Sequence, residues 1–218
     1  NGLTVAVFHD ARLPIVQIQL LVPAGSAQEP AGEAGVANLT VSMLSQGTTS
    51  RTPAAFAAAV EALGGSVGGI ASREFTAVHG SFLAADFESG LELLADAVVH
   101  PVFTEEQLPL VKKQIAAALQ RERQNPALLA DEHLWATVYA GHPYGRSPQG
   151  ALRSLSPLGL VQVRAFHRDR YRPDQALIAI AGDVPPERAF KAAEELLGSW
   201  GGHTREWRPA AVPPPGTG

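Results

Sequence analysis

The chain has 218 residues, of which 45% are hydrophobic and 17% charged, and its net charge is -4. This balance allows a sizeable buried core and excludes a collagen-like, coiled-coil or disordered chain, while the missing basic stripe disfavours nucleic acid and anionic membranes as partners. The absence of cysteine excludes disulfides and thiolate metal sites. No apolar run approaches the ~20 residues of a membrane span. No signal-peptide pattern is found at Asn1. The chain does not begin with Met, which indicates a segment or a processed form.

Hydrophobic periodicity and Pro/Gly signals predict an ordered series of strands and helices. Strands are expected at 4–8, 15–22, 66–72, 75–83 and 175–181, and helices at 33–46, 52–63, 86–99, 104–124, 126–140, 157–169 and 186–197. The first two strands flank a polar turn, so we expect them to pair as a hairpin. The strand at 175–181 is apolar on both parities, which indicates a central or doubly covered position.

This order of elements predicts an α+β fold. Paired strands, a block of helices, and a returning strand and helix describe a mostly antiparallel sheet with helices packed on one face. We expect one domain over 1–207. The Pro/Gly-rich residues 208–218 are expected to form a linker.

Two patterns that carry chemistry elsewhere do not do so here. The segment Gly64–Gly68 matches G-x-S-x-G, but the nucleophile elbow needs a strand before its serine and a helix after it. Here a helix precedes the glycines and a strand follows. The histidines are scattered, and no two stand four apart on one helix, the spacing that lets both reach one zinc ion. The residues alone therefore predict no assembled catalytic site.

The segment Gly35–Thr48, G-V-A-N-L-T-V-S-M-L-S-Q-G-T, resembles the active-site helix of the M16 (pitrilysin-type) zinc peptidases, which reads roughly G-L-A-H-F-L-E-H-M-L-F-K-G-T and carries the inverted H-x-x-E-H motif. The resemblance extends in order along nearly the whole chain. It includes Asn1–Val5, Gly25–Glu29, Ala62–Gly65, Pro101–Phe103, His142–Gly145, Tyr171–Asp174 and Ala181–Val184.

The three motif positions all depart from the family pattern. The two histidine ligands fall on Asn38 and Ser42, and the catalytic glutamate falls on Val41. An amide and a hydroxyl are weak zinc ligands compared with two imidazoles, and valine cannot act as a general base. The third ligand aligns with Gln114.

Two glutamates of the same region, Glu106 and Glu122, compete with Gln114 for the alignment to the third ligand.

In the family, a strand near the metal pairs with the substrate backbone and carries N-A-hydrophobic. The candidate positions on that strand here are Ser66, Gly68, Gly69 and Ile70.

The resemblance implies a non-catalytic M16 domain, the N-terminal one of a tandem pair. The family includes such members: the non-catalytic subunit of mitochondrial processing peptidase, core proteins of respiratory complexes, and inactive partners in bacterial heterodimeric peptidases. We expect the chain to pair with a catalytic, zinc-bearing M16 homologue and to help enclose a peptide substrate. No cofactor is expected on this chain, since the zinc would lie on the partner subunit.

Two alternatives remain open at this point. One is an active zinc endopeptidase with atypical ligands, such as His79 or His100, which folding would bring together at one site. The other is a purely structural assembly subunit that binds no peptide. The Ala-rich composition without cysteine favours a bacterial origin, and it leaves the compartment open between periplasm and cytoplasm.

Overall fold

The computed structural model describes residues 1–202, and the predicted linker 208–218 and the end of the predicted domain 1–207 lie outside them. The strands are β1 (Thr4–His9), β2 (Ile15–Val22), β3 (Ser66–Ala71), β4 (Thr76–Leu83) and β5 (Leu177–Gly182). The helices are α1 (Val36–Met43), α2 (Pro53–Ala62), α3 (Phe87–Val99), α4 (Gln107–Glu122), α5 (Pro126–Val138), α6 (Leu152–Leu155), α7 (Leu160–Arg170) and α8 (Pro186–Leu197). In this part of the chain, no helix has the length and apolar character to cross a membrane.

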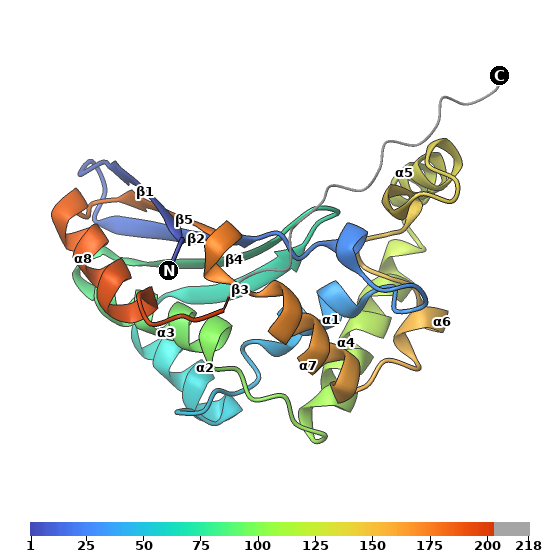
Figure 1. Cartoon of the computed structure of the whole chain (residues 1–218), viewed down its shortest axis with the longest axis horizontal. Coiled ribbons are helices and arrows are strands. Elements are labelled where there is room, and N and C mark those ends of the chain that lie inside the picture. The colour runs from blue at the N-terminus through green and yellow to red at the C-terminus, as the bar shows by residue number, and fades with distance from the viewer. Residues whose placement is uncertain (203–218) are drawn as a thin grey trace.

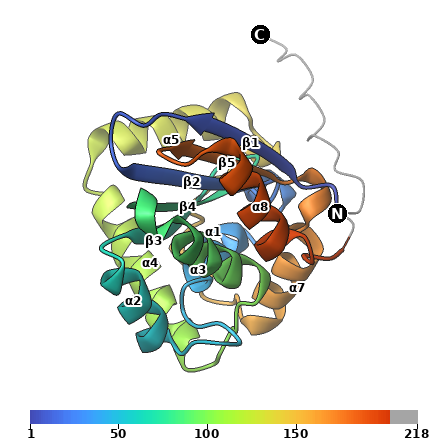
Figure 2. The ribbon, with the colours of Figure 1, turned by 90° about the vertical axis from the view of Figure 1, so that its left-hand side faces the viewer.

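The strands form one sheet in the order β1-β5-β2-β4-β3. Only the pairing of β1 with β5 is parallel within the described sheet; β5 with β2, β2 with β4 and β4 with β3 are antiparallel. Helices cover one face of this sheet (Figure 2). Helix α5 stands apart from the other helices (Figure 1). The predicted fold class, α+β with a mostly antiparallel sheet covered on one face, is confirmed.

The predicted hairpin between the first two strands is wrong. Strand β5 lies between β1 and β2 and pairs with both, as its apolar sequence on both parities indicated. The end of β5 is fixed from both sides: Asp10 N–H donates to Gly182 O at 2.9 Å, and Asp183 N–H donates to Ile15 O at 3.0 Å. Local alternation predicts a strand but not its neighbour, and here the neighbour lies at the other end of the chain.

The core lies between the sheet and its helical layer. On β2 the side chains of Val16, Ile18, Leu20 and Val22 are buried, while the residues between them face the open side of the sheet. This alternation follows from the period-2 geometry of a strand with one covered face. The segment Gly64–Gly68 runs from the end of α2 into β3, so the structure confirms that it is not a nucleophile elbow.

The ring of Phe82 on β4 sits between Gly90 of α3 and Gly65, which directly precedes β3. A Cβ built on Gly90 of α3 would lie 2.3 Å from the Phe82 ring, and one built on Gly65 would also lie 2.3 Å from it. Phe82 is fully packed, with 2% of its surface exposed. The close approach of α3 to β4 therefore depends on glycine at position 90.

Replacing Gly90 by Ala is expected to lower the free energy of unfolding by about 1–3 kcal/mol, because the added methyl overpacks the Phe82 ring. A loss of stability would be informative, because helix propensity alone favours alanine over glycine by ~1 kcal/mol in a helix interior. Urea unfolding measures the change. Ser89→Ala, an exposed substitution on the same helix, is the control and is expected to be neutral or slightly stabilising. Equal stability of Gly90→Ala and the wild type would contradict the packing argument.

Candidate functional site

Asn38 and Ser42 lie one turn apart on α1 and line the same cavity of about 220 Å³. This follows from the helix repeat, which places residues i and i+4 on one face. Asn38 is buried, with 9% of its surface exposed. The opposite wall comes from α4 and from the segment before α6. The full lining is Asn38, Ser42, Val111, Gln114, Ile115, Ala118, Leu119, Glu122 and Gln149.

The structure places Gln114 in this cavity, across from Asn38 and Ser42. Glu122, one of the two competing glutamates, also lines it, whereas Glu106 lies exposed at the start of α4, outside the lining. Ala118 stands one helical turn from both Gln114 and Glu122 on the same face. Sequence reasoning missed Ala118 because alanine carries no chemistry that would draw attention to it.

Val41 points away from this cavity toward β3. A Cβ built on Gly69 would lie 2.3 Å from Val41 Cγ2, so the valine methyl fills the space beside the strand. Val41 is 4% exposed. Val41, the residue predicted to align with the catalytic glutamate of the family motif, thus fills the space between α1 and the edge strand.

The start of α1 is held against the segment before α6 by two glycines. Gly35 has φ +96° and Gly150 has φ +78°, and a Cβ built on Gly150 would lie 2.7 Å from Gly35 Cα. This close backbone approach brings the carbonyl of Gln149 within 3.3 Å of Asn38 Nδ2, which donates to it. Gln149, far away in sequence, therefore joins the cavity through this contact.

A buried carboxyl group caps the same end of α1. Glu29 Oε1 accepts hydrogen bonds from the backbone N–H groups of Gly35 (2.9 Å) and Ala37 (3.1 Å). Oε2 is buried and has no hydrogen-bond partner. Burial raises the pKa of Glu29 to about 7, although the two N–H donors and Arg146 act in the opposite direction.

The raised pKa of Glu29 makes stability depend on pH. Its folded value of about 7 lies above the ordinary 4.5, so its contribution is full below pH 4.5 and is lost as pH rises through 7. The free energy of unfolding is expected to fall by up to about 3 kcal/mol over this window. Urea unfolding at pH 5 and pH 8 should show a flatter profile for Glu29→Gln, and an unaltered one for the exposed control Glu61→Gln. Parallel wild-type and Glu29→Gln profiles would contradict the assignment.

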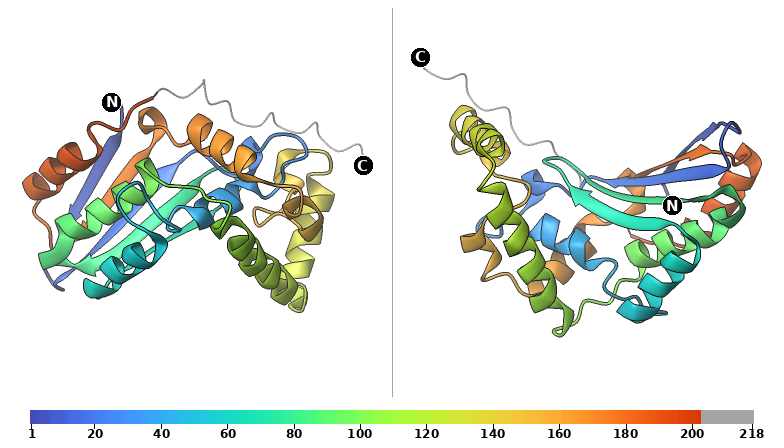
Figure 3. Two further views of the ribbon diagram at one scale, coloured as in Figure 1. Left: turned by 90° about the horizontal axis from the view of Figure 1, so that it is seen from below. Right: turned by 180° about the vertical axis from the view of Figure 1, so that it is seen from behind.

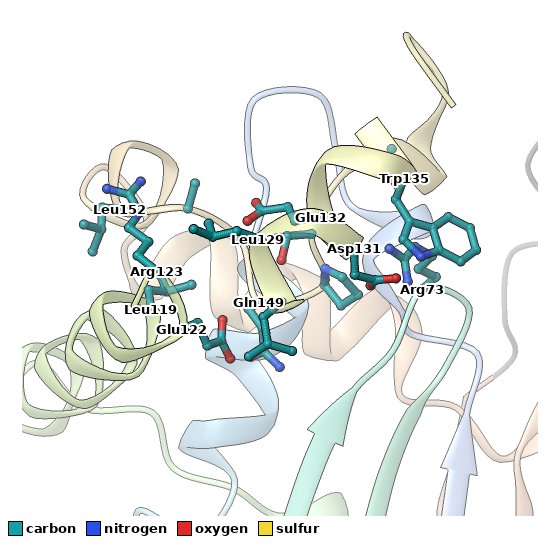
Figure 4. A pocket seen from close by; sticks show the side chains of 16 residues that line it. Arg73, Leu119, Glu122, Arg123, Leu129, Asp131, Glu132, Trp135, Gln149 and Leu152 are labelled. Carbon is teal, nitrogen blue, oxygen red and sulfur yellow. The ribbon is translucent and has the colours of Figure 1, made fainter. Parts of the chain in front are cut away.

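A second cavity, of about 230 Å³, adjoins the first and shares Leu119, Glu122 and Gln149 with it. Figure 4 shows its two ends: Arg123 and Leu152 at one, and Arg73 and Trp135 at the other. Its lining also includes Asp131 and Glu132 of α5. This second cavity, called the outer cavity below, is therefore lined by charges of both signs. In the first cavity, called the inner cavity below, Glu122 is the one charged lining side chain within the described residues.

The tip of the β3–β4 hairpin is clasped by α5 and the short turn Pro143–Gly145. The Arg73 guanidinium lies over the Trp135 ring, 3.7 Å from its centroid, and Arg73 Nε donates to Tyr144 O at 3.0 Å. The Tyr144 hydroxyl donates to the Glu74 carboxylate. The segment His142–Gly145, singled out from the sequence, thus anchors the hairpin that carries β3.

Strand β3 is an edge of the sheet (Figure 3). All four substrate-strand candidates lie on it, and Ile70 is 54% exposed. β3 also contacts α1, where Gly69 lies against Val41. An unpaired edge strand offers backbone N–H and C=O groups to an added strand.

The structure does not bring His79 and His100 together. His79 lies on β4 and is exposed on the open face of the sheet, whereas His100 follows α3 in the helical layer, with Nδ1 3.7 Å from Asp96 Oδ1. Within residues 1–202, no three His, Cys, Asp or Glu side chains are grouped so as to hold a metal ion.

Two family models match successive parts of the sequence. The model of the family described as "Insulinase (Peptidase family M16)" matches residues 4–151, and that of "Peptidase M16 inactive domain" matches residues 158–218. An uncharacterized zinc protease of Mycobacterium leprae is 27% identical over 199 residues, covering 91% of this chain and 45% of the relative. A probable mitochondrial-processing peptidase subunit beta of Schizosaccharomyces pombe is 29% identical over 202 residues, covering 91% and 43%.

Solved structures agree with these matches. A peptidase M16 inactive domain from Pseudomonas fluorescens superimposes with a TM-score of 0.85 at 30% identity, covering 96% of this chain and 52% of that one. A protease from Helicobacter pylori shares the fold with a TM-score of 0.85 at 21% identity, covering 98% and 51%. The chain spans about half the length of the relatives it matches. Because the first family model covers most of the chain, the chain belongs to peptidase family M16.

Proposed function

We propose that this chain is a non-catalytic M16 unit, which binds peptide along the free edge of β3 and works beside a zinc-bearing homologue. The homologue supplies the metal and the base. The observation that carries the proposal is the set of side chains at the motif positions: Asn38 and Ser42 in the inner cavity and Val41 against β3.

These residues do not fit the zinc ion that the family implies. The Asn38 amide nitrogen already donates to Gln149 O, and a hydroxyl such as that of Ser42 is a poor substitute for an imidazole ligand. Valine at position 41 holds no lone pair that could take a proton from water. No step of peptide cleavage is therefore assigned to this chain.

The substrate role rests on backbone chemistry, which survives the loss of the motif. An added peptide strand is bound by main-chain hydrogen bonds, and these need no particular side chains on β3. The clasp of the hairpin tip by Arg73, Trp135 and Tyr144 supports the role by fixing β3 at one end. In the proposed complex, this unit holds substrate and the partner cleaves it.

The partnership is tested by peptide cleavage with and without the zinc-bearing homologue from the same organism. We expect no cleavage by this chain alone and a higher kcat/KM for the homologue once the chain is added. Full activity of the homologue by itself, unchanged on mixing, would overturn the partnership.

Strand addition is tested separately with N-methylated peptides. Only alternate amides of an added strand face β3, so methylation of one parity is expected to abolish binding to the complex, and methylation of the other parity to be tolerated. The two peptides have the same composition, which makes each the control for the other. If no peptide binds the assembled complex, the chain is a structural subunit instead.

A further inference from the structure

Two adjacent glycines of β3 have neighbours from other elements where their own side chains would be. Gly68 faces the open side of the sheet, and a Cβ built on it would lie 2.9 Å from His79 Nε2. Gly69 faces the helical layer, and its Cβ would lie 2.3 Å from Val41 Cγ2. An imidazole and a valine methyl thus replace the two missing side chains at the edge of the sheet.

His79 is chemically distinct from its surroundings. It is paired with Gly68 on one side and with Gln19 on the other. Among the open-face positions of the described sheet it is the one ionisable side chain. The other open-face positions hold apolar residues, one glycine, and the uncharged polar residues Thr4, Gln17, Gln19, Ser66 and Ser81.

On the helical face of β3, Val41 makes the surface beside Gly69 apolar. It borders a small hollow of about 20 Å³ whose lining, apart from Ser45 and the glycines of β3, is apolar: Val41, Leu44, Val67, Val78 and Ala97. This volume is about what a single water molecule needs, roughly 10–15 Å³. A side chain that points to this side of the edge meets a methyl surface with little room behind it.

We propose that β3 selects two adjacent residues of an added peptide: an acidic side chain beside His79 and a small apolar side chain facing Val41. This rests on the proposed binding of peptide to β3. Directly opposed residues of paired strands place their Cβ atoms about 4.5–5.5 Å apart, so a residue opposite Gly68 lies within reach of the imidazole. The next residue points to the opposite face, toward Val41.

The charge pattern explains the choice of an acid. An imidazole N–H is a donor, and an ionised carboxylate is acceptor-only. No Lys or Arg occupies another open-face position of the sheet to compete for that carboxylate. The glycine at position 68 is what lets the ring of His79 reach the edge, because any side chain there would meet the ring.

The test uses fluorescein-labelled ten-residue peptides with one Asp moved through successive positions of a fixed soluble sequence, and the same peptides with Ala or Asn at that position. Fluorescence anisotropy gives Kd for the chain and for its complex with the zinc-bearing homologue. We expect one position at which Asp binds about three- to fivefold more tightly than Ala, the range of one side-chain hydrogen bond.

His79→Phe is the decisive variant, because it keeps a planar ring over Gly68 and removes the donor. It should abolish the preference for Asp, whereas His133→Phe, the same change at an exposed histidine of α5, should retain it. At the neighbouring peptide position, Ala or Val should bind better than Leu or Phe, and Val41→Ala should reduce that difference.

Two results would overturn the proposal in distinguishable ways. Peptides that bind with alternate-amide dependence but equally well with Asp, Asn or Ala at every position would leave β3 as a strand-addition site and remove the selection by His79. Failure of every peptide to bind would remove both the proposed function and this inference.

Discussion

A variant with His at positions 38 and 42 and Glu in place of Ala118 is expected to hold about one zinc ion per chain, the three-ligand arrangement of catalytic zinc sites. Asn38 and Ser42 already share one cavity with Ala118 on the facing helix. Two imidazoles at i and i+4 point the same way from α1, and Ala118 is the central position of the facing wall. We therefore expect a glutamate that replaces Ala118 to act as the third zinc ligand better than one that replaces Gln114.

Zinc content after incubation with excess metal and a chelator wash measures this result. The matched comparison is the same double histidine variant with Gln114→Glu, and Asn38→His alone is the control that lacks the second imidazole. We expect the wild-type chain to retain almost no zinc. One tightly held zinc in the wild type would show that the degenerate motif was aligned to the wrong residues.

Zinc alone should not restore cleavage. A general base must be added by Val41→Glu, and this carboxylate would enter a site that is 4% exposed and packed against Gly69. Burying an unpaired charge is unfavourable, so Val41→Glu is expected to destabilise the metal-free chain and to be tolerated better with zinc bound. Cleavage by the four-position variant, and not by the three-position one, would support the assignment of position 41.

The sequence predicted the strands and helices well because each signal is local. Alternation located β2 and β4, and Pro53 marked the start of α2. The pairing of β1 with β5 was missed because hydrogen-bond partners far apart in the chain leave no periodic trace. Strand β5, the last one described, lies between β1 and β2 and pairs in parallel with β1 at the edge of the sheet.

The candidate site was predictable where the resemblance named its positions. Asn38, Ser42 and Gln114 do line one cavity, although their correspondence to metal ligands stays a prediction. Gln149 was missed because only the close contact of Gly35 with Gly150 brings it there. Glu29 was seen as part of a resembling loop, but nothing in the sequence revealed that its carboxyl group is buried at the start of α1.

Replacing Asp96 by Ala is expected to lower the free energy of unfolding by about 3 kcal/mol, because a buried carboxylate with several donors would be lost. Asp96 Oδ2 accepts hydrogen bonds from Thr48 Oγ1 (2.6 Å), Ser50 Oγ (2.6 Å) and Arg51 Nη1 (2.8 Å). These donors belong to the loop that follows α1. Asp96 therefore ties the end of the motif helix to α3.

The pH dependence of this network has the opposite sign to that of Glu29. Burial pushes the pKa of Asp96 up, but the hydrogen bonds from Ser50, Thr48 and Arg51 outweigh it and hold the pKa below its usual 3.8. The stabilising contribution is therefore present above pH 3.8 and is lost as pH falls through the lowered folded value. Asp96→Asn, which keeps the shape, should remove this part of the acid-induced loss.

A surface ion pair supplies the matched control for Asp96. Glu88 pairs with Arg188, with about half of the Glu88 side chain exposed (48%), and Glu88→Gln is expected to change the free energy of unfolding by less than about 1 kcal/mol. Urea unfolding of Asp96→Ala, Asp96→Asn and Glu88→Gln at neutral pH ranks the three. If Asp96→Ala is no worse than Glu88→Gln, the network does not hold the loop after α1. The position of Ser42 and Val41 would then depend on the Glu29 cap at the start of α1 and on the packing of α1 against its neighbours, chiefly α4, α7 and β3.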